Sequence, residues 1–455
     1  MQPRSLGLAT DLYQLTMAAG YFVNRSDQTA VFELFTRRLP ANRSFLIAAG
    51  LQQALEYICE LGFDSEEIEY LRRLPTFSHV PAEFFDYLGE FRFSGEVWAM
   101  PEGTPFFPPE PIMRIKAPIL EAQLLETYLL STVNFQTMIA SKAARIVQAA
   151  DSRGVVEFGS RRAHGMEAGL YAARAAFIGG CIGTSNVEAG YRFGIPVSGT
   201  MAHSWVMSYA TERAAFKAYI NLFPETAVLL LDTYDTVSGA KLAVELNANL
   251  KGVRLDSGDI GDLSKKVRRI LDDGDHKNTK ILASGDLDEN SISKLLADGA
   301  PIDLFGVGTM LSTSWDAPSL GGVYKLVEQT SGGKTEAKMK VSANKSSYPG
   351  EKQVWRHSDD QGRFQFDTLT LDDEVIPNAK PLLECVIRNG KIIKETPSLN
   401  EIQARAKNDL NSFAVEVIQM KDPAKYEIKC SGALEDLHSK VMSEIESHHN
   451  KNGKD

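Results

Sequence analysis

Gly252-Val-Arg-Leu-Asp-Ser-Gly-Asp259 is a short apolar run that ends in polar and glycine residues, and the helix-like tract Ile260–Leu271 follows it. The same order recurs along the middle of the chain from Gly154 onward. Strand-like runs that alternate with helix-like tracts are typical of βα units and of a parallel sheet. The stretch therefore predicts an α/β fold for this part of the chain.

Seven strand-like runs can be counted in this region, and helix-like tracts separate most of them. The runs are Val155–Phe158, Gly180–Gly183, Ile195–Gly199, Ala227–Leu231, Gly252–Leu255, Lys280–Ala283 and Leu304–Val307. A usual closed barrel has eight strands. We therefore expect an irregular or incomplete (β/α) barrel of about seven strands, in preference to an open doubly wound sheet. The first strand is not followed by Gly-x-Gly-x-x-Gly, which disfavours a dinucleotide-binding domain.

The flanking segments are richer in strands. The N-terminal segment predicts helices over Thr10–Phe22 and Leu51–Leu61, a strand over Ala30–Phe35, edge strands with rigid turns in the proline-rich Gly95–Lys116, and two helices in Ala117–Ala150. The C-terminal segment predicts strands over Gly321–Gln329, Ala337–Ala343, Lys352–Arg356 and Arg363–Leu371, then a helix over Ser398–Phe413. We divide the chain into an N-terminal α+β domain (1–117), the barrel (118–317), and C-terminal strands and helices (318–455) that pack back on the N-terminal domain.

Composition narrows the class of protein. The 455 residues carry 49 Lys and Arg against 59 Asp and Glu, a net charge of −10, which argues against binding nucleic acid through its phosphates. No run is long enough to span a membrane, and the first residues lack a signal-peptide core. The four cysteines form no Cys-x-x-Cys pair, so we expect no zinc cage and a reducing, cytoplasmic location.

The loops that follow the predicted strands carry the candidate site, because the carboxyl ends of parallel strands meet at one rim. Arg161 and Arg162 open a helix-like tract after the first strand and suggest an anion site. Ser185, in Gly183-Thr-Ser-Asn186, leaves room for a flat ligand. His203 lies among small residues in Val197-Ser-Gly-Thr-Met-Ala-His-Ser-Trp205, where its ring should be accessible.

The remaining loops add carboxylates and glycines. Asp232 and Asp235 emerge from a buried strand and suit Mg²⁺, sugar hydroxyls or the orientation of a histidine. Arg254 and Asp256 alternate along one strand and so point to the same side. Ser284-Gly-Asp286 and Gly306-Val-Gly-Thr309 end the last two strands, where glycine amides can approach a phosphate. Together the loops suggest a site for a polyanionic sugar phosphate.

Each loop also has a plainer interpretation. Arg161 and Arg162 could form a solvated basic turn, and Gly183–Asn186 could be an ordinary turn. His203 could be a buried histidine that only hydrogen-bonds its neighbours. Asp235 could cap a helix, and Arg254 with Asp256 could be a structural ion pair. The functional interpretation depends on all these loops meeting at one rim.

Several long motifs, in order, resemble nicotinate phosphoribosyltransferases of the type II phosphoribosyltransferase group. They are Thr10-Asp-Leu-Tyr-Gln-Leu-Thr-Met17, Glu157-Phe-Gly-Ser-Arg-Arg162, Gly183-Thr-Ser-Asn186, Gly199-Thr-Met-Ala-His-Ser204, Val253-Arg-Leu-Asp-Ser-Gly-Asp259 and Pro349-Gly-Glu-Lys-Gln-Val-Trp-Arg356. The resemblance implies transfer of ribosyl phosphate from phosphoribosyl pyrophosphate to nicotinate, which gives nicotinate mononucleotide and pyrophosphate in NAD salvage. It also implies Mg²⁺, ATP as a co-substrate hydrolysed through a phosphohistidine, and a homodimer with a shared active site.

The resemblance assigns roles to individual positions. His203 matches the phosphorylated histidine, Asp256 a contact to the ribose or its metal, and Asp232 a weaker metal ligand, while Arg254 is counted with His203 and Asp256 as catalytic. The substrate-binding positions are Tyr13 from a neighbouring subunit, Phe158, Arg161, Ser185, Thr200, Ser284, Gly285, Gly306, Gly308 and Thr309. Phe158 and Tyr13 would stack on the pyridine ring, and Gly306, Gly308 and Thr309 would hold the 5′-phosphate.

Ser185 bears on substrate choice. Relatives that use nicotinamide have an acidic residue here, and a carboxylate would repel nicotinate, so Ser185 favours the acid. Other interpretations stay open: a nicotinamide- or quinolinate-using relative, a type I phosphoribosyltransferase suggested by Val228–Gly239, and a catalytically silent binding protein on the same scaffold. The type I signature has two adjacent acidic residues, whereas Thr233 and Tyr234 separate Asp232 from Asp235 here.

Overall fold

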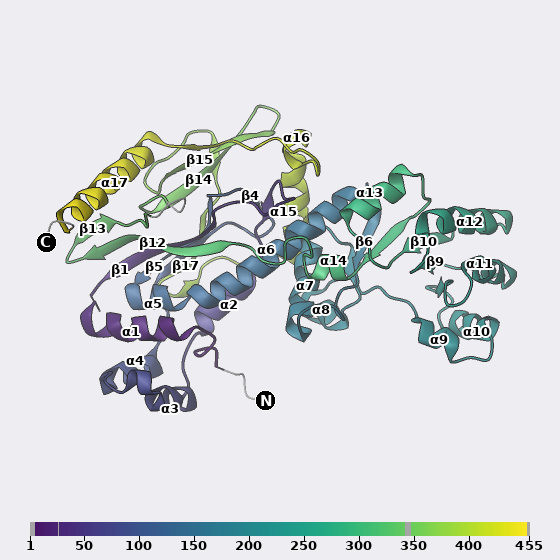
Figure 1. Cartoon of the computed structure of the whole chain (residues 1–455), viewed down its shortest axis with the longest axis horizontal. Coiled ribbons are helices and arrows are strands. Elements are labelled where there is room, and N and C mark those ends of the chain that lie inside the picture. Colours follow the sequence, from purple (N-terminus) through teal and green to yellow (C-terminus); the bar gives the residue numbers. More distant parts are fainter. Residues whose placement is uncertain (1–4, 26, 342–346, 453–455) are drawn as a thin grey trace. The chain divides into compact units, whose positions relative to one another are not determined.

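The computed structural model describes residues 5–25, 27–341 and 347–452. Its chain forms two compact units. The first contains residues up to 137 together with 319–398 and 404–455, and the second contains 138–318 with 399–403. Helices α6 (Glu126–Ala149) and α15 (Leu399–Asn411) have residues in both units (Figure 1).

The first unit is built on a seven-stranded antiparallel sheet to which both ends of the chain contribute. The strand order is β13 (Lys334–Ala337), β12 (Gly322–Ser331), β1 (Thr29–Thr36), β5 (Pro111–Pro118), β3 (Glu96–Ala99), β17 (Glu384–Arg388) and β18 (Lys391–Ile392). C-terminal β12 pairs with N-terminal β1, and β17 pairs with β3. The expected α+β domain of N- and C-terminal segments is therefore confirmed.

Smaller sheets and helices complete this unit. The sheets are β16 (Ala379–Pro381), β14 (Lys352–Ser358), β15 (Phe364–Leu371) and β19 (Ile428–Cys430) in that order, and the pair β2 (Leu46–Ile47) with β4 (Pro105–Phe106). The helices are α1 (Leu12–Asn24), α2 (Leu51–Glu60), α3 (Ser65–Arg73), a 3-10 turn (Pro75–Phe77), α4 (Ala82–Glu90), α5 (Ile119–Leu124), α16 (Val415–Ile418) and α17 (Gly432–Asn452). Helix α1 lies along α5, and α3 lies against α4 (Figure 1).

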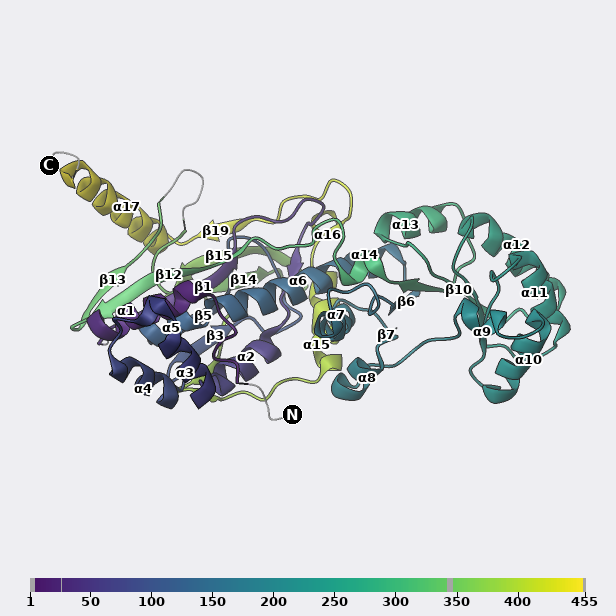
Figure 2. The same cartoon turned by 60° about the horizontal axis from the view of Figure 1, so that its bottom comes forward.

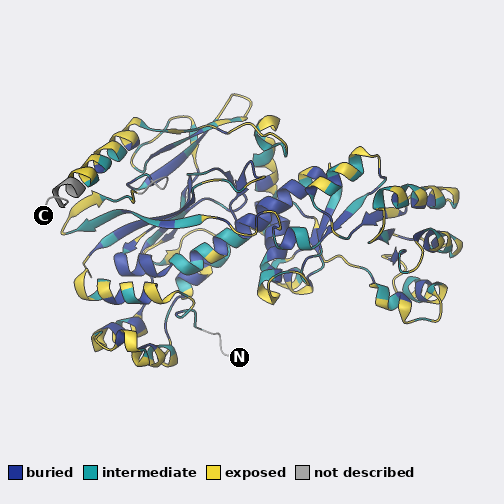
Figure 3. Ribbon diagram, in the orientation of Figure 1, coloured by how far each residue is buried: buried dark blue, intermediate teal, exposed yellow. Residues whose placement is uncertain are grey.

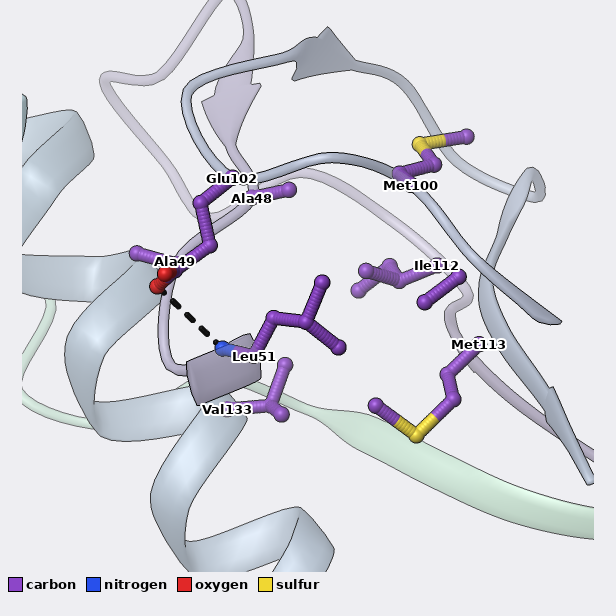
Figure 4. Close-up of a pocket in the computed structure, with 9 residues that line it drawn as sticks. Ala48, Ala49, Leu51, Met100, Glu102, Ile112, Met113 and Val133 are labelled. Atoms are coloured by element: carbon purple, nitrogen blue, oxygen red, sulfur yellow. Dashed lines mark hydrogen bonds between the residues drawn. The ribbon is translucent and has the colours of Figure 1, made fainter. Parts of the chain in front are cut away.

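The N-terminus of α2 is held by a buried carboxylate. Glu102 Oε1 accepts the backbone N–H groups of Gly50, at 2.6 Å, and Leu51, at 3.2 Å, and so satisfies two amides that helix geometry leaves free. Figure 4 shows Glu102 and Leu51 at the edge of a small pocket whose other lining side chains are apolar. The pocket is a gap in the core of the first unit.

Two predictions for the flanking segments need correction. Pro111–Pro118 is a central strand between β1 and β3, and not an edge strand, because its prolines stand at its first and last positions and leave the interior amides free to pair. The strand expected over Ala337–Ala343 is instead Lys334–Ala337, which pairs with β12 through a turn at Gly332 and Gly333; residues 342 and 343 lie outside the described residues.

The second unit contains a six-stranded sheet in which every neighbouring pair is parallel. The order is β7 (Gly183–Thr184), β6 (Gly154–Glu157), β11 (Leu304–Val307), β10 (Lys280–Ala283), β9 (Gly252–Leu255) and β8 (Val228–Leu230). Its helices are α7 (Met166–Ile178), α8 (Val187–Phe193), α9 (His203–Met207), α10 (Glu212–Leu222), α11 (Thr236–Glu245), α12 (Ile260–Asp273), α13 (Glu289–Ala297) and α14 (Thr309–Ser312). Helices α11 and α12 lie side by side in both views (Figures 1 and 2).

The core of this unit explains why the sheet forms. Leu229, Val253 and Ile281, each fully buried, come from adjacent strands and pack with buried residues of α10, α11 and α12. Figure 3 shows the same pattern, with buried strands and helices that are exposed on their outer faces. Parallel strands covered by helices are apolar along their whole length, which matches the short apolar runs in the sequence.

The barrel is incomplete, as expected. The predicted strand Ile195–Gly199 forms an isolated parallel bridge between Val197 and Thr184, because most of its residues are exposed and cannot pack in a core. Beyond it, the Thr200 hydroxyl donates to the Val228 carbonyl of β8. The ring of strands is thus open between this segment and β8, and six of the seven expected strands join the sheet within the described residues.

A buried cluster in the first unit gives a first prediction. Asp367 accepts hydrogen bonds from Arg356 Nη2, at 2.6 Å, and from the Tyr426 hydroxyl, at 3.0 Å. Glu110 is also buried and accepts the Phe107 N–H at 2.9 Å. Burial raises the pKa of Glu110 well above its ordinary value. The negative charge of Asp367, and a hydrogen bond with it, raise this pKa further. The neutral form of Glu110 is therefore favoured over a wider pH range than that of an exposed glutamate.

We predict that Glu110→Gln changes the free energy of unfolding by less than about 1 kcal/mol at pH 7, because the amide can donate to Asp367 and still accept from Phe107. Glu110→Ala should cost about 2–3 kcal/mol, since it leaves buried partners unsatisfied. The raised pKa means that wild-type stability falls as pH rises from the unfolded pKa near 4.5 toward the folded one. Glu110→Gln should lack this fall in urea unfolding at pH 5 and pH 8, and equal losses in both variants would contradict the assignment.

Candidate functional site

Asp256, just past the end of β9, is the centre of a polar cluster at the carboxyl ends of the strands. Its Oδ1 accepts the Ser284 hydroxyl at 2.5 Å and lies 3.5 Å from Arg254 Nη2. Its Oδ2 lies 3.8 Å from His203 Nε2. Three predicted residues, one from β9, one from the loop after β10 and one at the start of α9, therefore meet at one carboxylate. The alternation of Arg254 and Asp256 along β9 places both on the same side, as expected.

His203 is the first residue of α9 and stays accessible. Its side chain is 39% exposed, so the interpretation as a buried structural histidine does not hold. The other ring nitrogen, Nδ1, lies 3.2 Å from the hydroxyl of Thr233, in the loop after β8. One nitrogen thus faces a hydroxyl and the other a carboxylate, which fixes the plane of the ring.

Asp232 supports the same cluster from the loop after β8. Its Oδ2 accepts the Asp256 N–H at 3.0 Å and the Ser257 hydroxyl at 2.6 Å. Its Oδ1 is buried and has no hydrogen-bond partner among the described residues. A free carboxylate oxygen of this kind fits a hard cation such as Mg²⁺.

A cage made by the protein alone is not seen. In the described ranges, no three His, Cys, Asp or Glu side chains gather closely enough to hold a metal ion. Mg²⁺ commonly binds through one or two carboxylates and completes its shell with water and substrate phosphates. The residues present therefore fit a metal that arrives with a phosphorylated ligand, and Asp232 and Asp256 are the carboxylates available to it.

Arg254 and Arg161 place two positive charges near each other. Burial lowers the pKa of Arg254, the charges of Asp256 and Asp232 oppose this, and the nearby Arg161 lowers the pKa further. Arg254 Nε is buried without a partner among the described residues. Two guanidinium groups close enough to repel each other are stabilised by an anion, and planar carboxylates fit them well.

Arg161 differs from its predicted setting. Helix α7 begins at Met166, so Arg161 and Arg162 lie in a turn closed by the Arg162 N–H to Gly159 carbonyl bond, and they do not open the helix. Both arginines are exposed. The anion site suggested by the sequence therefore has guanidinium groups but no helix N-terminus.

Glycines and small residues line the rest of this edge. A Cβ at Gly306 would lie 2.5 Å from the Phe158 ring, and one at Gly285, with φ of +110°, would lie 2.7 Å from the Asp256 carbonyl oxygen. Gly308 precedes α14, whose first residue, Thr309, is half-buried. The absence of side chains at Gly285 and Gly306 thus lets neighbouring loops approach closely.

Thr200 and Ser185, two predicted substrate-binding residues, lie among hydrogen-bonded polar groups. The Thr200 hydroxyl is engaged with the Val228 carbonyl. Ser185 is half-buried between Thr184, whose hydroxyl donates to Glu157 at 2.6 Å, and Asn186, whose side chain caps α8 by accepting the Ala189 N–H at 2.9 Å. The loop is thus more than an ordinary turn.

Asp235 follows the plainer interpretation, since its side chain caps α11 by accepting the Ser238 N–H at 2.8 Å. Tyr13 lies on α1 of the first unit, with 48% of its surface exposed. Partial burial, and then the charge of Glu126, raise the pKa of Tyr13. A role for Tyr13 at this site stays a prediction.

Reasoning from the sequence missed three supporting residues. Glu157 and Thr184 bond to each other across adjacent strands, and Thr233 orients His203. Glu157 gave a signal, because an acidic residue at the end of an otherwise apolar strand is costly to bury. Thr233 gave none beyond its place between Asp232 and Tyr234.

Comparisons with known proteins match this chain along most of its length. Family models match over residues 8–134 (nicotinate phosphoribosyltransferase N-terminal domain), 154–368 (nicotinate phosphoribosyltransferase family) and 376–438 (nicotinate phosphoribosyltransferase C-terminal domain). Among similar proteins, a nicotinate phosphoribosyltransferase of Mycobacterium tuberculosis is 45% identical, covering 91% of this chain and 89% of its own. The Bacillus subtilis enzyme of that name is 41% identical, covering 97% and 95%.

Solved structures of similar proteins match the fold of this chain. Human nicotinic acid phosphoribosyltransferase superposes with a TM-score of 0.83 at 30% identity, covering 95% of this chain and 99% of its own. A nicotinate-nucleotide pyrophosphorylase from Pyrococcus furiosus gives 0.73 at 27% identity, covering 89% and 95%.

The fold and the polar cluster define an α/β protein with an irregular barrel whose candidate site lies at the carboxyl ends of its parallel strands. The family models and the 45% identity make the assignment more specific. The chain belongs to the nicotinate phosphoribosyltransferase family.

The close packing of Gly306 gives a second prediction. Gly306→Ala should lower the free energy of unfolding by about 1–3 kcal/mol, because the added methyl group would displace the Phe158 ring. Gly199→Ala, on the same rim, is the matched control, since its Cβ would meet nothing within 4 Å. The control should lie within about 1 kcal/mol of wild type. Equal losses for both variants in urea unfolding would contradict the packing described for Phe158.

Proposed function

We propose that this chain catalyses transfer of ribosyl phosphate from phosphoribosyl pyrophosphate to nicotinate, giving nicotinate mononucleotide and pyrophosphate, in NAD salvage. Family membership supports the reaction class. The observation that carries the proposal is the cluster in which Asp256 meets Arg254, His203 and Ser284 at the carboxyl ends of the strands. It joins a carboxylate, a guanidinium group, an imidazole ring and a hydroxyl within reach of one ligand.

The chemistry suits these residues. The pyridine nitrogen already has a free lone pair, so no general base is required. A bond forms between that nitrogen and the ribose C1′, while the bond from C1′ to the pyrophosphate oxygen breaks with its electron pair. Positive charge builds on the ribose, and the Asp256 carboxylate, held in place by Ser284 and the Asp232–backbone bond, stabilises it.

Phosphate binding is proposed for the far side of the same edge. Ser284, Gly285, Gly306, Gly308 and Thr309 offer backbone N–H groups and hydroxyls to the 5′-phosphate. Mg²⁺, held by Asp232 and Asp256, would supply charge neutralisation for the pyrophosphate. The unpartnered Asp232 Oδ1 supports this role.

Selection of the acid over the amide rests on charge. Arg161 and Arg254 repel each other, and the nicotinate carboxylate would relieve that repulsion. Ser185 adds no negative charge nearby, and Thr200 completes this part of the site. Phe158 would stack against one face of the pyridine ring.

Two features of the proposal concern the whole protein. Tyr13, half-exposed on α1, would supply the opposite face of the pyridine from a neighbouring subunit, which makes the enzyme a homodimer with a shared active site.

The four cysteines Cys59, Cys181, Cys385 and Cys430 are free, which suits a reducing cytoplasm. Cys181 is fully buried, and burial raises the pKa of its thiol. No described helix is long and apolar enough to cross a bilayer.

A direct assay distinguishes the open alternatives. With Mg²⁺ and phosphoribosyl pyrophosphate, wild type should convert nicotinate to its mononucleotide and leave nicotinamide and quinolinate largely unused. Ser185→Asp should weaken nicotinate use at least tenfold, because the new carboxylate faces that of the substrate; Ser208→Asp, on the exposed end of α9, is the control. Preference for another pyridine would reject the substrate assignment, and ligand binding without turnover would favour a silent binding protein.

We further propose that ATP hydrolysis is coupled to this reaction through His203. The γ-phosphoryl group would pass from ATP to a ring nitrogen of His203 with release of ADP, and water would later release phosphate. The exposure of the ring, and its orientation between Thr233 and Asp256, support this role.

His203→Asn should keep a weak activity that ATP no longer stimulates, because the amide cannot carry a phosphoryl group through the cycle. The measurement is the rate of nucleotide formation with and without ATP, in wild type and variant. Acid-labile labelling of wild type by γ-labelled ATP, lost in the variant, is the companion test. Full ATP stimulation of the variant would refute the coupling.

A further inference from the structure

Glu157 ends β6, the strand next to the edge strand β7, and is completely buried. Its neighbours in the strand register are Val307 of β11 on one side and Thr184 of β7 on the other. Phe158 follows Glu157 directly along the chain, Arg161 comes three residues later, and Ser185 follows Thr184. Glu157 therefore lies between the two loops to which the proposed pyridine contacts belong.

The Glu157 carboxylate bonds to both loops. Oε1 accepts the Gly159 N–H, and Oε2 accepts the Thr184 hydroxyl at 2.6 Å. The two oxygens are thus used on two separate segments of chain. Neither donor belongs to a charged side chain, and no ion pair of Glu157 occurs among the described residues.

Both bonded segments are fixed further along. Thr184 Oγ1 accepts the Asn186 N–H at 3.0 Å, and the Ser185 N–H donates to the Glu157 carbonyl at 2.9 Å, so Ser185 is held from both sides. Gly159 has no room for a side chain, because a Cβ there would lie 2.3 Å from Ser312 of α14. The Phe158 N–H donates to the Val307 carbonyl at 2.8 Å.

A carboxylate in this position is costly. Burial raises the pKa of Glu157, and the hydrogen bonds from Thr184 and Gly159 oppose that rise. An apolar residue would fill the end of a buried strand without this cost. The chain instead carries an acid whose oxygens link two loops, which indicates a role in setting their geometry.

We propose that Glu157, acting through Thr184 and Gly159, is a positioning residue that fixes the spacing between Phe158 on one loop and Ser185 on the next. The inference rests on the proposed use of these loops to bind nicotinate. The hydrogen bonds of Glu157 affect the pyridine end of the site, because Asp256, Ser284 and His203 are held by other hydrogen bonds. Losing the hydrogen bonds of Glu157 should therefore weaken nicotinate binding more than binding of phosphoribosyl pyrophosphate.

Removal of one hydroxyl tests this with little change in shape. Thr184→Val should raise KM for nicotinate roughly tenfold, because it removes the buried hydroxyl that donates to Glu157 and accepts the Asn186 N–H. KM for phosphoribosyl pyrophosphate should stay within about twofold. Thr184→Ser restores the hydroxyl and should restore KM. Thr279→Val is the matched control, because it removes another buried hydroxyl of the same unit, bonded to the Leu250 carbonyl at 3.4 Å.

Glu157→Gln provides a second variant if Thr184→Val does not fold. Its amide keeps one acceptor but cannot accept from both donors, so KM for nicotinate should again rise selectively, and the preference for nicotinate over nicotinamide should narrow. An unchanged nicotinate KM, or equal increases for both substrates as in a general loss of structure, would overturn the proposal. Failure of wild type to use nicotinate at all would instead reject the proposed function.

Discussion

The structure of the second unit depends on parallel pairing, which places the ends of β8, β9 and β10 at one edge of the sheet. Arg254 pairs with Leu282 on one side and Leu230 on the other. Asp256 therefore emerges between the loop of Asp232 and the loop of Ser284, and it bonds to both. His203 reaches the same carboxylate from more than 50 positions away, at the start of α9.

The same pairing explains how much of the fold could be predicted from sequence. Short runs such as Gly252–Leu255, each bounded by glycine or polar residues and followed by a helix-like tract, favour strands, and the structure confirms a strand there. The run Ile195–Gly199 has similar composition but is exposed, and it forms a bridge. Burial depends on the whole fold, so the pattern alone could not separate the two cases. The prolines of Pro111–Pro118 led to the wrong prediction of an edge strand for a related reason. Proline has no N–H to donate, so its position in the ladder decides whether a strand can be central.

Some residues of the candidate site could be predicted from the sequence, and others could not. Arg254 and Asp256 could be assigned to one face from the two-residue period of a strand. The contact of His203 with Thr233, and the bond of Glu157 to Thr184, join separate loops and depend on register. Single-sequence patterns do not contain register, so these supporting residues were found only in the structure. Tyr13 belongs to the other unit, and its role remains a prediction from family resemblance.

The central claim is that loops from β6 to β11 form one binding site at the carboxyl edge of the parallel sheet. A crystal structure with nicotinate mononucleotide bound tests it most directly. We expect the pyridine ring against Phe158, the ribose beside Asp256 and the phosphate at Gly306–Thr309. A nucleotide bound elsewhere on the protein, with Asp256 and Phe158 making no contact to it, would contradict the account.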